Sequence, residues 1–280
     1  MKPAPFAYAK ARTLDDAIRL MGEHKGEAKL LAGGQSLIAT LNMRLSSPSL
    51  LVDINGVAGL DDVSVRNGTV EIGALKRHAT LERSSDIAKH APLIALAMPH
   101  IAHPAIRNRG TIGGSLAYAD PAAELPACLV ALDGELDIAG PGGKRSVKAG
   151  DFFKGLFETA LGPHDVLSAV RFPAATTETR VGFAELSRRL GDYAMVGLAA
   201  AANASGKGLS DVRLVYFGVG ATPVRARKAE AALAAGSVDE AVKALDFEPT
   251  GDLHATSEVK KHLAGVLLRR VAKQLTEPRA

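Results

Sequence analysis

The chain carries the run Leu31-Ala32-Gly33-Gly34-Gln35-Ser36-Leu37 between an expected buried strand, residues 28–32, and a segment with helical spacing, residues 36–45. Glycine has no Cβ, so consecutive backbone N–H groups of such a turn can point into one concavity and bind an anion. The run is neither a Walker loop nor a Gly-x-Gly-x-x-Gly fingerprint. Taken by itself, it is as consistent with a helix-capping turn as with a phosphate site.

A second stretch of similar composition follows at Gly110-Thr111-Ile112-Gly113-Gly114-Ser115-Leu116. It is also expected to form a turn whose bare amides can face an anion. Thr111 and Ser115 add hydroxyl donors, as Ser36 does in the first stretch. Two such turns predict one shared ligand with enough oxygens to contact both, which favours the pyrophosphate of a dinucleotide over a mononucleotide.

The composition is that of a soluble globular protein of one large or two smaller domains, with 280 residues, 28 glycines and a net charge of +4. Basic residues are spread along the chain without interleaved aromatics, so we expect no nucleic-acid binding. No apolar stretch approaches the roughly 20 residues of a membrane span. The one cysteine, Cys128, is expected in the core, and the predicted setting is the cytoplasm.

The periodicity of the first half predicts a mixture of helices and short strands. Thr13 caps an expected helix, Asn67-Gly68 indicates a hairpin with a type I′ turn, and Pro92 and Pro99 should interrupt a helical stretch from about 80 to 101. Further strands or hairpins are expected at residues 50–54, 136–147 and 165–172.

Residues 174–179 are small, polar and unpatterned, and they form the expected domain boundary. The second half is predicted to be α+β. Its expected strands cover residues 181–188 and 212–218, with an apolar run at 195–202 between them. Its expected helices cover about 225–235, 238–244 and 256–275, the last with one apolar side typical of a packed surface helix.

Catalytic motifs are poorly supported. Ser115 lacks the glycine spacing of a nucleophile elbow, and His100 and His103 flank a segment unsuited to zinc. Asp120 and Glu124 could form a carboxylate pair for acid–base chemistry, but a single acid that binds sugar or ribityl hydroxyls requires less coincidence.

Taken in order, the two glycine stretches, the run Asp120-Pro121-Ala122-Ala123-Glu124-Leu125-Pro126 and the run Arg188-Arg189-Leu190-Gly191-Asp192-Tyr193-Ala194 resemble the FAD-binding medium subunit of molybdenum hydroxylases. The resemblance covers essentially the whole chain. It implies an α+β fold: a two-lobed FAD-binding domain of the vanillyl-alcohol oxidase/PCMH type over residues 1–175, with lobes at about 1–55 and 56–175, and a smaller cap domain over residues 176–280.

The resemblance also assigns cofactor contacts to positions of this chain. The first pyrophosphate loop would comprise Ala32, Gly33, Gly34, Gln35, Ser36 and Leu37, and the second Thr111, Gly113, Gly114 and Ser115. Glu124 would contact cofactor hydroxyls. Apolar groups beside the adenine or isoalloxazine would be Ile101, Ile106 and Leu167. Tyr193 matches an aromatic residue beside the flavin ring, and a core tyrosine is an equal reading of it. Many relatives have His at Gln35 and Asn at Ser115.

The implied enzyme has three kinds of subunit, assembled as a dimer of heterotrimers. This chain would hold non-covalent FAD, a small subunit would hold two [2Fe–2S] clusters, and a large subunit would hold the molybdenum cofactor. One cysteine agrees with that division, because the clusters need several Cys ligands. Electrons would pass through the clusters to the flavin and on to an external acceptor. A standalone flavin oxidase and a non-catalytic interaction module are the alternative functions.

Overall fold

The N-terminal part of the chain forms a small parallel sheet that leads into the first glycine stretch. The computed structural model describes residues 2–24, 26–206 and 208–277. The sheet has the order β1-β3-β2, and its elements with two helices are β1 (Ala7–Lys10), α1 (Leu14–Glu23), β2 (Ala28–Leu31), α2 (Leu37–Asn42) and β3 (Leu50–Asp53). Thr13 caps α1 as predicted, with its hydroxyl accepting from the Asp16 N–H at 3.1 Å. Strand β1 was not predicted, because it is mostly exposed and carries no apolar run.

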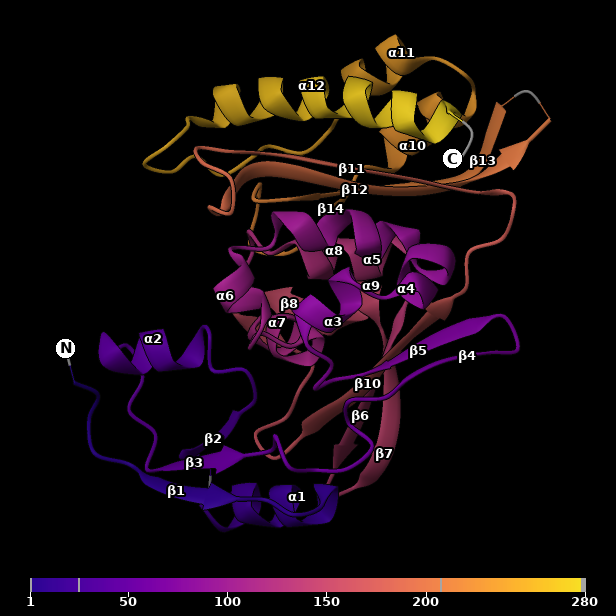
Figure 1. Ribbon diagram of the computed structural model, residues 1–280. Helices are drawn as coiled ribbons and strands as arrows, with labels where there is room; N and C mark the ends of the chain where they lie inside the picture. Colours follow the sequence, from indigo (N-terminus) through magenta and orange to yellow (C-terminus); the bar gives the residue numbers. More distant parts are fainter. Residues whose placement is uncertain (1, 25, 207, 278–280) are drawn as a thin grey trace.

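An antiparallel sheet of order β4-β5-β10-β6-β7 forms the framework of the next part (Figure 1). Its strands are β4 (Val63–Arg66), β5 (Thr69–Gly73), β6 (Glu135–Gly140), β7 (Gly143–Lys148) and β10 (Val166–Pro173). Asn67 and Gly68 have φ values of 51° and 73°, so the predicted type I′ hairpin is confirmed. The hairpin predicted over residues 136–147 is confirmed as β6 and β7.

Short helices pack over this sheet and separate it from the C-terminal part. They are α3 (His78–Glu82), α4 (Ser85–His90), α5 (Pro92–Ala97), the 3₁₀ helix η1 (Met98–His100), α6 (Pro104–Arg107), α7 (Ile112–Tyr118), α8 (Glu124–Ala131) and α9 (Ala149–Phe152), with the small hairpin β8 (Phe153–Gly155) and β9 (Glu158–Thr159) beside them. Pro92 begins α5 and Pro99 lies in η1, as the predicted interruptions require. A further break at Ser84, the N-cap of α4, was not predicted.

A four-stranded antiparallel sheet with helices on its outer face completes the chain (Figure 1). Its elements are β11 (Thr179–Ser187), β12 (Ala194–Ser205), β13 (Gly208–Phe217), β14 (Val224–Arg225), α10 (Arg227–Ala234), α11 (Val238–Lys243) and α12 (Ser257–Thr276). Alternate residues of β13 serve two cores: Leu214 and Tyr216 pack against the outer helices, whereas Val215 and Phe217 face the helical layer.

The largest hydrophobic core crosses from the helical layer into the C-terminal sheet. Ile94 of α5 and Leu125 of α8 belong to the same buried cluster as Phe183 and Phe217, whose rings stack with centroids 5.8 Å apart. The C-terminal sheet is therefore packed directly on α5 and α8, and α8 in turn contacts α7, which carries the second glycine stretch. Within the described part of the chain, no helix is long and apolar enough to cross a membrane.

Candidate functional site

The first glycine stretch is a tight loop between β2 and α2. Gly34 has φ of +74°, a left-handed conformation that favours glycine. The Ile38 N–H donates to the Gly34 carbonyl at 3.1 Å, and the Gln35 side-chain amide donates to the Gly33 carbonyl at 3.1 Å. Ser36 occupies the N-cap position of α2, but its side chain makes no capping bond. Hydrogen bonds to the Gly33 and Gly34 carbonyls thus hold the loop, and its own backbone N–H groups are not needed for this.

This loop has more backbone N–H donors than acceptors for them in the described parts of the protein. Among the described residues, the backbone N–H groups of residues 33–37 donate to no protein acceptor. Gly33 is buried and its four successors are half-buried. Native structures pair nearly all of their backbone donors with protein or solvent, so a row of five unpaired N–H groups marks a place suited to an anion with several oxygens.

The second glycine stretch differs from the prediction. Gly113, Gly114 and Ser115 lie inside α7, whose N-cap is Thr111, so they do not form a turn. The Gly113 N–H donates to the Ala74 carbonyl at 2.8 Å, and the Gly114 N–H donates to the Thr111 hydroxyl at 3.1 Å. The expected bare amides of this stretch are therefore already used. Threonine at the N-cap makes helix formation favourable here despite the two glycines.

Gly113 is required for packing, because a Cβ on it would lie 2.7 Å from the Ala74 carbonyl oxygen. What the stretch offers to a ligand are hydroxyl groups. The Ser115 hydroxyl makes no hydrogen bond to any described residue, and its side chain is half-buried. Thr111 accepts at its N-cap oxygen and keeps a hydroxyl proton to donate.

The two stretches touch each other through backbone. An added Cβ at Gly33 would overlap the Arg109 carbonyl and lie 2.9 Å from the Gly110 Cα. Glycine at position 33 therefore allows a close approach of two chain segments that are far apart in sequence. The structure thus places the loop with the unpaired amides against the residues directly before Thr111, where the hydroxyl-bearing stretch begins.

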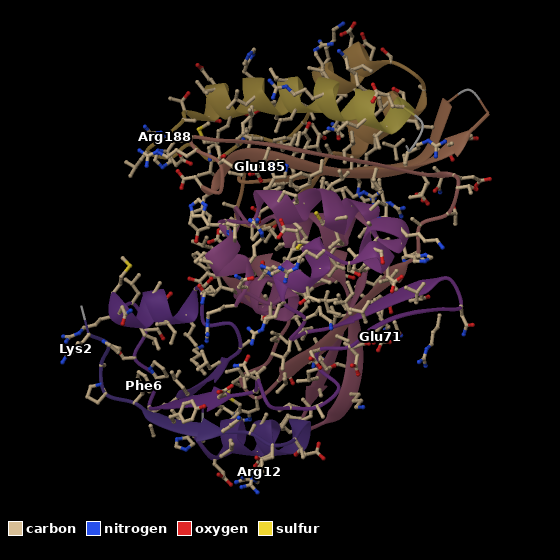
Figure 2. All side chains as sticks on the ribbon, viewed as in Figure 1. Lys2, Phe6, Arg12, Glu71, Glu185 and Arg188 are labelled. Atoms are coloured by element: carbon tan, nitrogen blue, oxygen red, sulfur yellow. The ribbon has the colours of Figure 1, made fainter. Side chains whose placement is uncertain are left out.

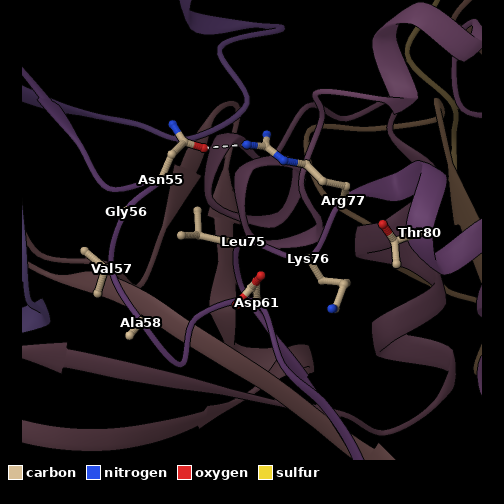
Figure 3. Close-up of a pocket in the computed structure, with 9 residues that line it drawn as sticks. All are labelled: Asn55, Gly56, Val57, Ala58, Asp61, Leu75, Lys76, Arg77 and Thr80. Atoms are coloured by element: carbon tan, nitrogen blue, oxygen red, sulfur yellow. Dashed lines mark hydrogen bonds between the residues drawn. The ribbon is translucent and has the colours of Figure 1, made fainter.

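Two residues that link these segments were missed at the sequence level. Arg77, the N-cap of α3, donates to the Arg109 carbonyl and, at 2.6 Å, to the Asn55 side-chain oxygen (Figure 3). Asn55 donates in turn to the Ala32 carbonyl at 2.9 Å. Its position at the carboxyl end of β3 is the one available signal, since loops at that edge of a parallel sheet commonly carry binding residues.

Glu124 lies among acidic groups at the junction with the C-terminal sheet. It begins α8 and is 8% exposed. Burial raises its pKa to about 8, and the charges of Glu185 and Asp120 add to the rise. Glu185 of β11 is 3% exposed and faces the helical layer (Figure 2). One of its oxygens lies 3.5 Å from His100 Nδ1, and the other makes no hydrogen bond to a described residue.

The remaining predicted contacts are distributed around this junction. Tyr193 is 68% exposed, so the alternative reading of a core tyrosine is wrong. Its loop rests against the segment between η1 and α6, because Gly191 approaches the Ala102 carbonyl and the ring of His103. The Asp120 and Glu124 charges add to the effect of partial burial in raising the pKa of Tyr193, which places all three near one another.

The predicted apolar neighbours differ in exposure. Ile101 and Leu167 are buried members of the main core, and Ile106 is half-buried. Leu167 lies in β10 opposite Ile138 of β6, so its side chain is chiefly a packing element of the antiparallel sheet.

An α+β fold with a donor-rich loop held against the start of a helix is suited to binding an anion with several oxygens. The sequence matches indicate the class of anion. A family model described as "FAD binding domain in molybdopterin dehydrogenase" matches residues 4–175, and one described as "CO dehydrogenase flavoprotein C-terminal domain" matches residues 182–275. The chain therefore belongs to the family of FAD-binding medium subunits of molybdopterin dehydrogenases, which are components of multi-subunit oxidoreductases.

Similar proteins match over nearly their whole length. The 6-hydroxypseudooxynicotine dehydrogenase complex subunit alpha of Paenarthrobacter nicotinovorans is 39% identical over 290 residues, covering 100% of this chain and 97% of that protein. A chain of the carbon monoxide dehydrogenase structure from Hydrogenophaga pseudoflava has a TM-score of 0.97 with 34% identity and full coverage of both chains. A chain of the quinoline 2-oxidoreductase structure from Pseudomonas putida 86 has a TM-score of 0.92 with 34% identity, covering 99% of this chain and 98% of that chain.

Proposed function

We propose that this chain holds FAD non-covalently, with the pyrophosphate between residues 32–37 and residues 111–115. The observation that supports this most strongly is the row of five unpaired N–H groups at residues 33–37. The hydroxyls of Ser36, Thr111 and Ser115 would supply further donors. The residues present fit a diphosphate, because these donors lie on two segments in mutual contact at Gly33, where no Cβ intervenes.

The other predicted contacts would bind the rest of the cofactor. A neutral, buried Glu124 can donate a hydrogen bond to a cofactor oxygen as well as accept one. Tyr193, exposed on the loop that contacts the segment between η1 and α6, would lie against the flavin ring. Ile101, Ile106 and Leu167 would provide apolar surface near the rings of the cofactor. In this arrangement the chain binds and orients the cofactor and excludes water from part of it.

FAD, when bound, supplies the redox chemistry of the subunit by accepting electrons and releasing them to an external acceptor. We propose that the electrons arrive from [2Fe–2S] clusters in a small partner subunit, and that substrate is oxidised at a molybdenum cofactor in a large one. Cys128, the one cysteine of the chain, is buried in α8 and offers no cluster ligand set. The assembly would be a cytoplasmic dimer of heterotrimers.

The proposed domain division follows the sheets. Residues 1–175 would form the FAD-binding domain, with the parallel sheet in a lobe over about 1–55 and the antiparallel sheet in a lobe over about 56–175. Residues 176–280 would form the cap, whose β11–β12 connection carries Tyr193 toward the cofactor.

Purification of the full chain tests the proposed cofactor. We expect a yellow protein with the absorption spectrum of oxidised flavin and about one FAD per chain, and acid precipitation should leave all of the flavin in the supernatant. Addition of reduced iron–sulfur partner subunit should bleach the flavin without any substrate of the isolated chain. A folded, colourless chain whose spectrum FAD titration does not change would contradict the proposal, and turnover of an organic substrate by the chain alone would favour a standalone oxidase.

A further inference from the structure

The two glycine stretches lie on parts of the fold that share no strand pairing in the described regions. The first follows β2 of the parallel sheet, and the second begins α7, which packs on the antiparallel sheet. Their direct contact is the backbone approach of Gly33 to Arg109 and Gly110. The two parts also share a hydrophobic core, in which Val52 of β3 packs in the same cluster as Val166 of β10. Side chains that hydrogen-bond to both stretches can set the spacing of their donors more directly.

Arg77 and Asn55 make that connection. The Arg77 guanidinium donates from one nitrogen to the Arg109 carbonyl, directly before the second stretch, and from another to Asn55 Oδ1 at 2.6 Å (Figure 3). Asn55 Nδ2 donates to the Ala32 carbonyl at 2.9 Å, within the first stretch. Two side chains thus join both stretches through hydrogen bonds to their backbone, and the planar fork of arginine fixes the angle between its two partners.

Asn55 is itself held in place by a second set of hydrogen bonds. Its backbone and side-chain N–H groups donate to Asp53 Oδ1 at 2.8 and 2.7 Å, and the Tyr8 hydroxyl donates to Asp53 Oδ2 at 2.6 Å. The network therefore extends from β1 through the end of β3 to the N-terminus of α3. A side chain fixed on both sides in this way is suited to positioning other groups.

We propose that Arg77 and Asn55 form a clamp that sets the first glycine stretch against the second at the spacing a pyrophosphate requires. This inference rests on the proposed FAD site. Arg77 acts here as a positioning residue, because its hydrogen bonds go to protein carbonyl and amide oxygens.

A double-mutant cycle on the full chain tests the clamp. We expect Arg77→Ala and Asn55→Ala each to weaken FAD binding by about tenfold or more, because the stretches lose their preset spacing. The double variant should bind FAD no more weakly than the single variant with the lower FAD affinity. Either change alone already breaks the connection through the Arg77–Asn55 hydrogen bond. Arg83→Ala, at the exposed C-terminal end of α3, is the matched control and should bind as wild type.

Chemical rescue separates positioning from general loss of structure. Arg77 lines a hollow of about 270 Å³ with Asn55, Asp61, Lys76 and Thr80, through which a small cation can reach the vacated position. Methylguanidinium should therefore restore FAD affinity to Arg77→Ala, whereas methylammonium, which lacks the planar fork, should not. If Arg77→Ala does not fold, Arg77→Lys keeps the charge without the fork and should still bind FAD more weakly than wild type.

The outcomes separate the two proposals. Tight FAD binding by wild type with unchanged affinity in Arg77→Ala, or in Arg77→Lys where that variant is used, overturns the clamp alone. Losses that multiply in the double variant also overturn it, because the two residues would then act independently. A wild-type chain that binds no FAD overturns the proposed function and the clamp with it.

Discussion

Replacing Ser36 with aspartate is expected to weaken FAD binding by at least about a hundredfold while leaving the fold intact. Ser36 stands at the N-cap of α2 and uses its side chain for no capping bond. A carboxylate there would accept from the unpaired N–H groups around it and repel the pyrophosphate. Two like charges about 4 Å apart repel by about 4 kcal/mol at an effective dielectric constant of about 20, roughly a thousandfold in affinity.

At position 36, the effect of a substitution on FAD affinity can be separated from its effect on the stability of the fold. Aspartate is among the most favourable N-cap residues, so thermal unfolding of the cofactor-free chain should be unchanged or shifted slightly upward. Ser36→Asn is the matched control, because asparagine has the size of aspartate but no charge. This variant should bind FAD with an affinity within a few-fold of wild type. Flavin fluorescence titration and thermal unfolding give both quantities. Wild-type affinity in Ser36→Asp would place the pyrophosphate away from residues 33–37.

The sequence predicted well those features whose causes are local. The cap at Thr13, the Asn67-Gly68 turn and the amphipathic helix α12 each depend on residues within one or two turns of one another, and each is confirmed. The second glycine stretch was misread because glycine composition suggests a turn. Here the Thr111 cap and the close contact of Gly113 with Ala74 stabilise a helix instead.

Sequence motifs predict one part of the candidate site, whereas the part that depends on long-range contacts has no motif. The family motifs pointed to residues 32–37, and the unpaired amides of residues 33–37 support that prediction. Arg77 and Asn55 lie 22 residues apart, and the Arg77 partner at Arg109 lies a further 32 along the chain. No local pattern encodes hydrogen bonds of that separation, so they emerge only from the assembled fold.

Glu124 predicts a strong pH dependence of stability in the cofactor-free chain. Its pKa rises from 4.5 to about 8 on folding, because burial and the charges of Glu185 and Asp120 disfavour the ionised form. The folded state therefore keeps a proton that the unfolded chain releases between these values, and stability falls as the pH rises from about 4.5 to 8. At about 1.4 kcal/mol per pKa unit, the fall approaches about 5 kcal/mol and is complete above pH 8.

Glu124→Gln isolates this contribution, since glutamine keeps the size and hydrogen-bonding groups of a protonated glutamate without titrating. Denaturant unfolding of both apo chains at pH 5, 7 and 9 should give similar stabilities at the lowest pH and a variant more stable than wild type at the highest. Glu185→Gln should reduce the fall without removing it, because burial is the larger cause and the charge of Asp120 persists. Parallel pH profiles for wild type and Glu124→Gln would mean that Glu124 is already ionised in the folded chain, and the acidic junction would then have to hold its charge through solvent or a bound cation.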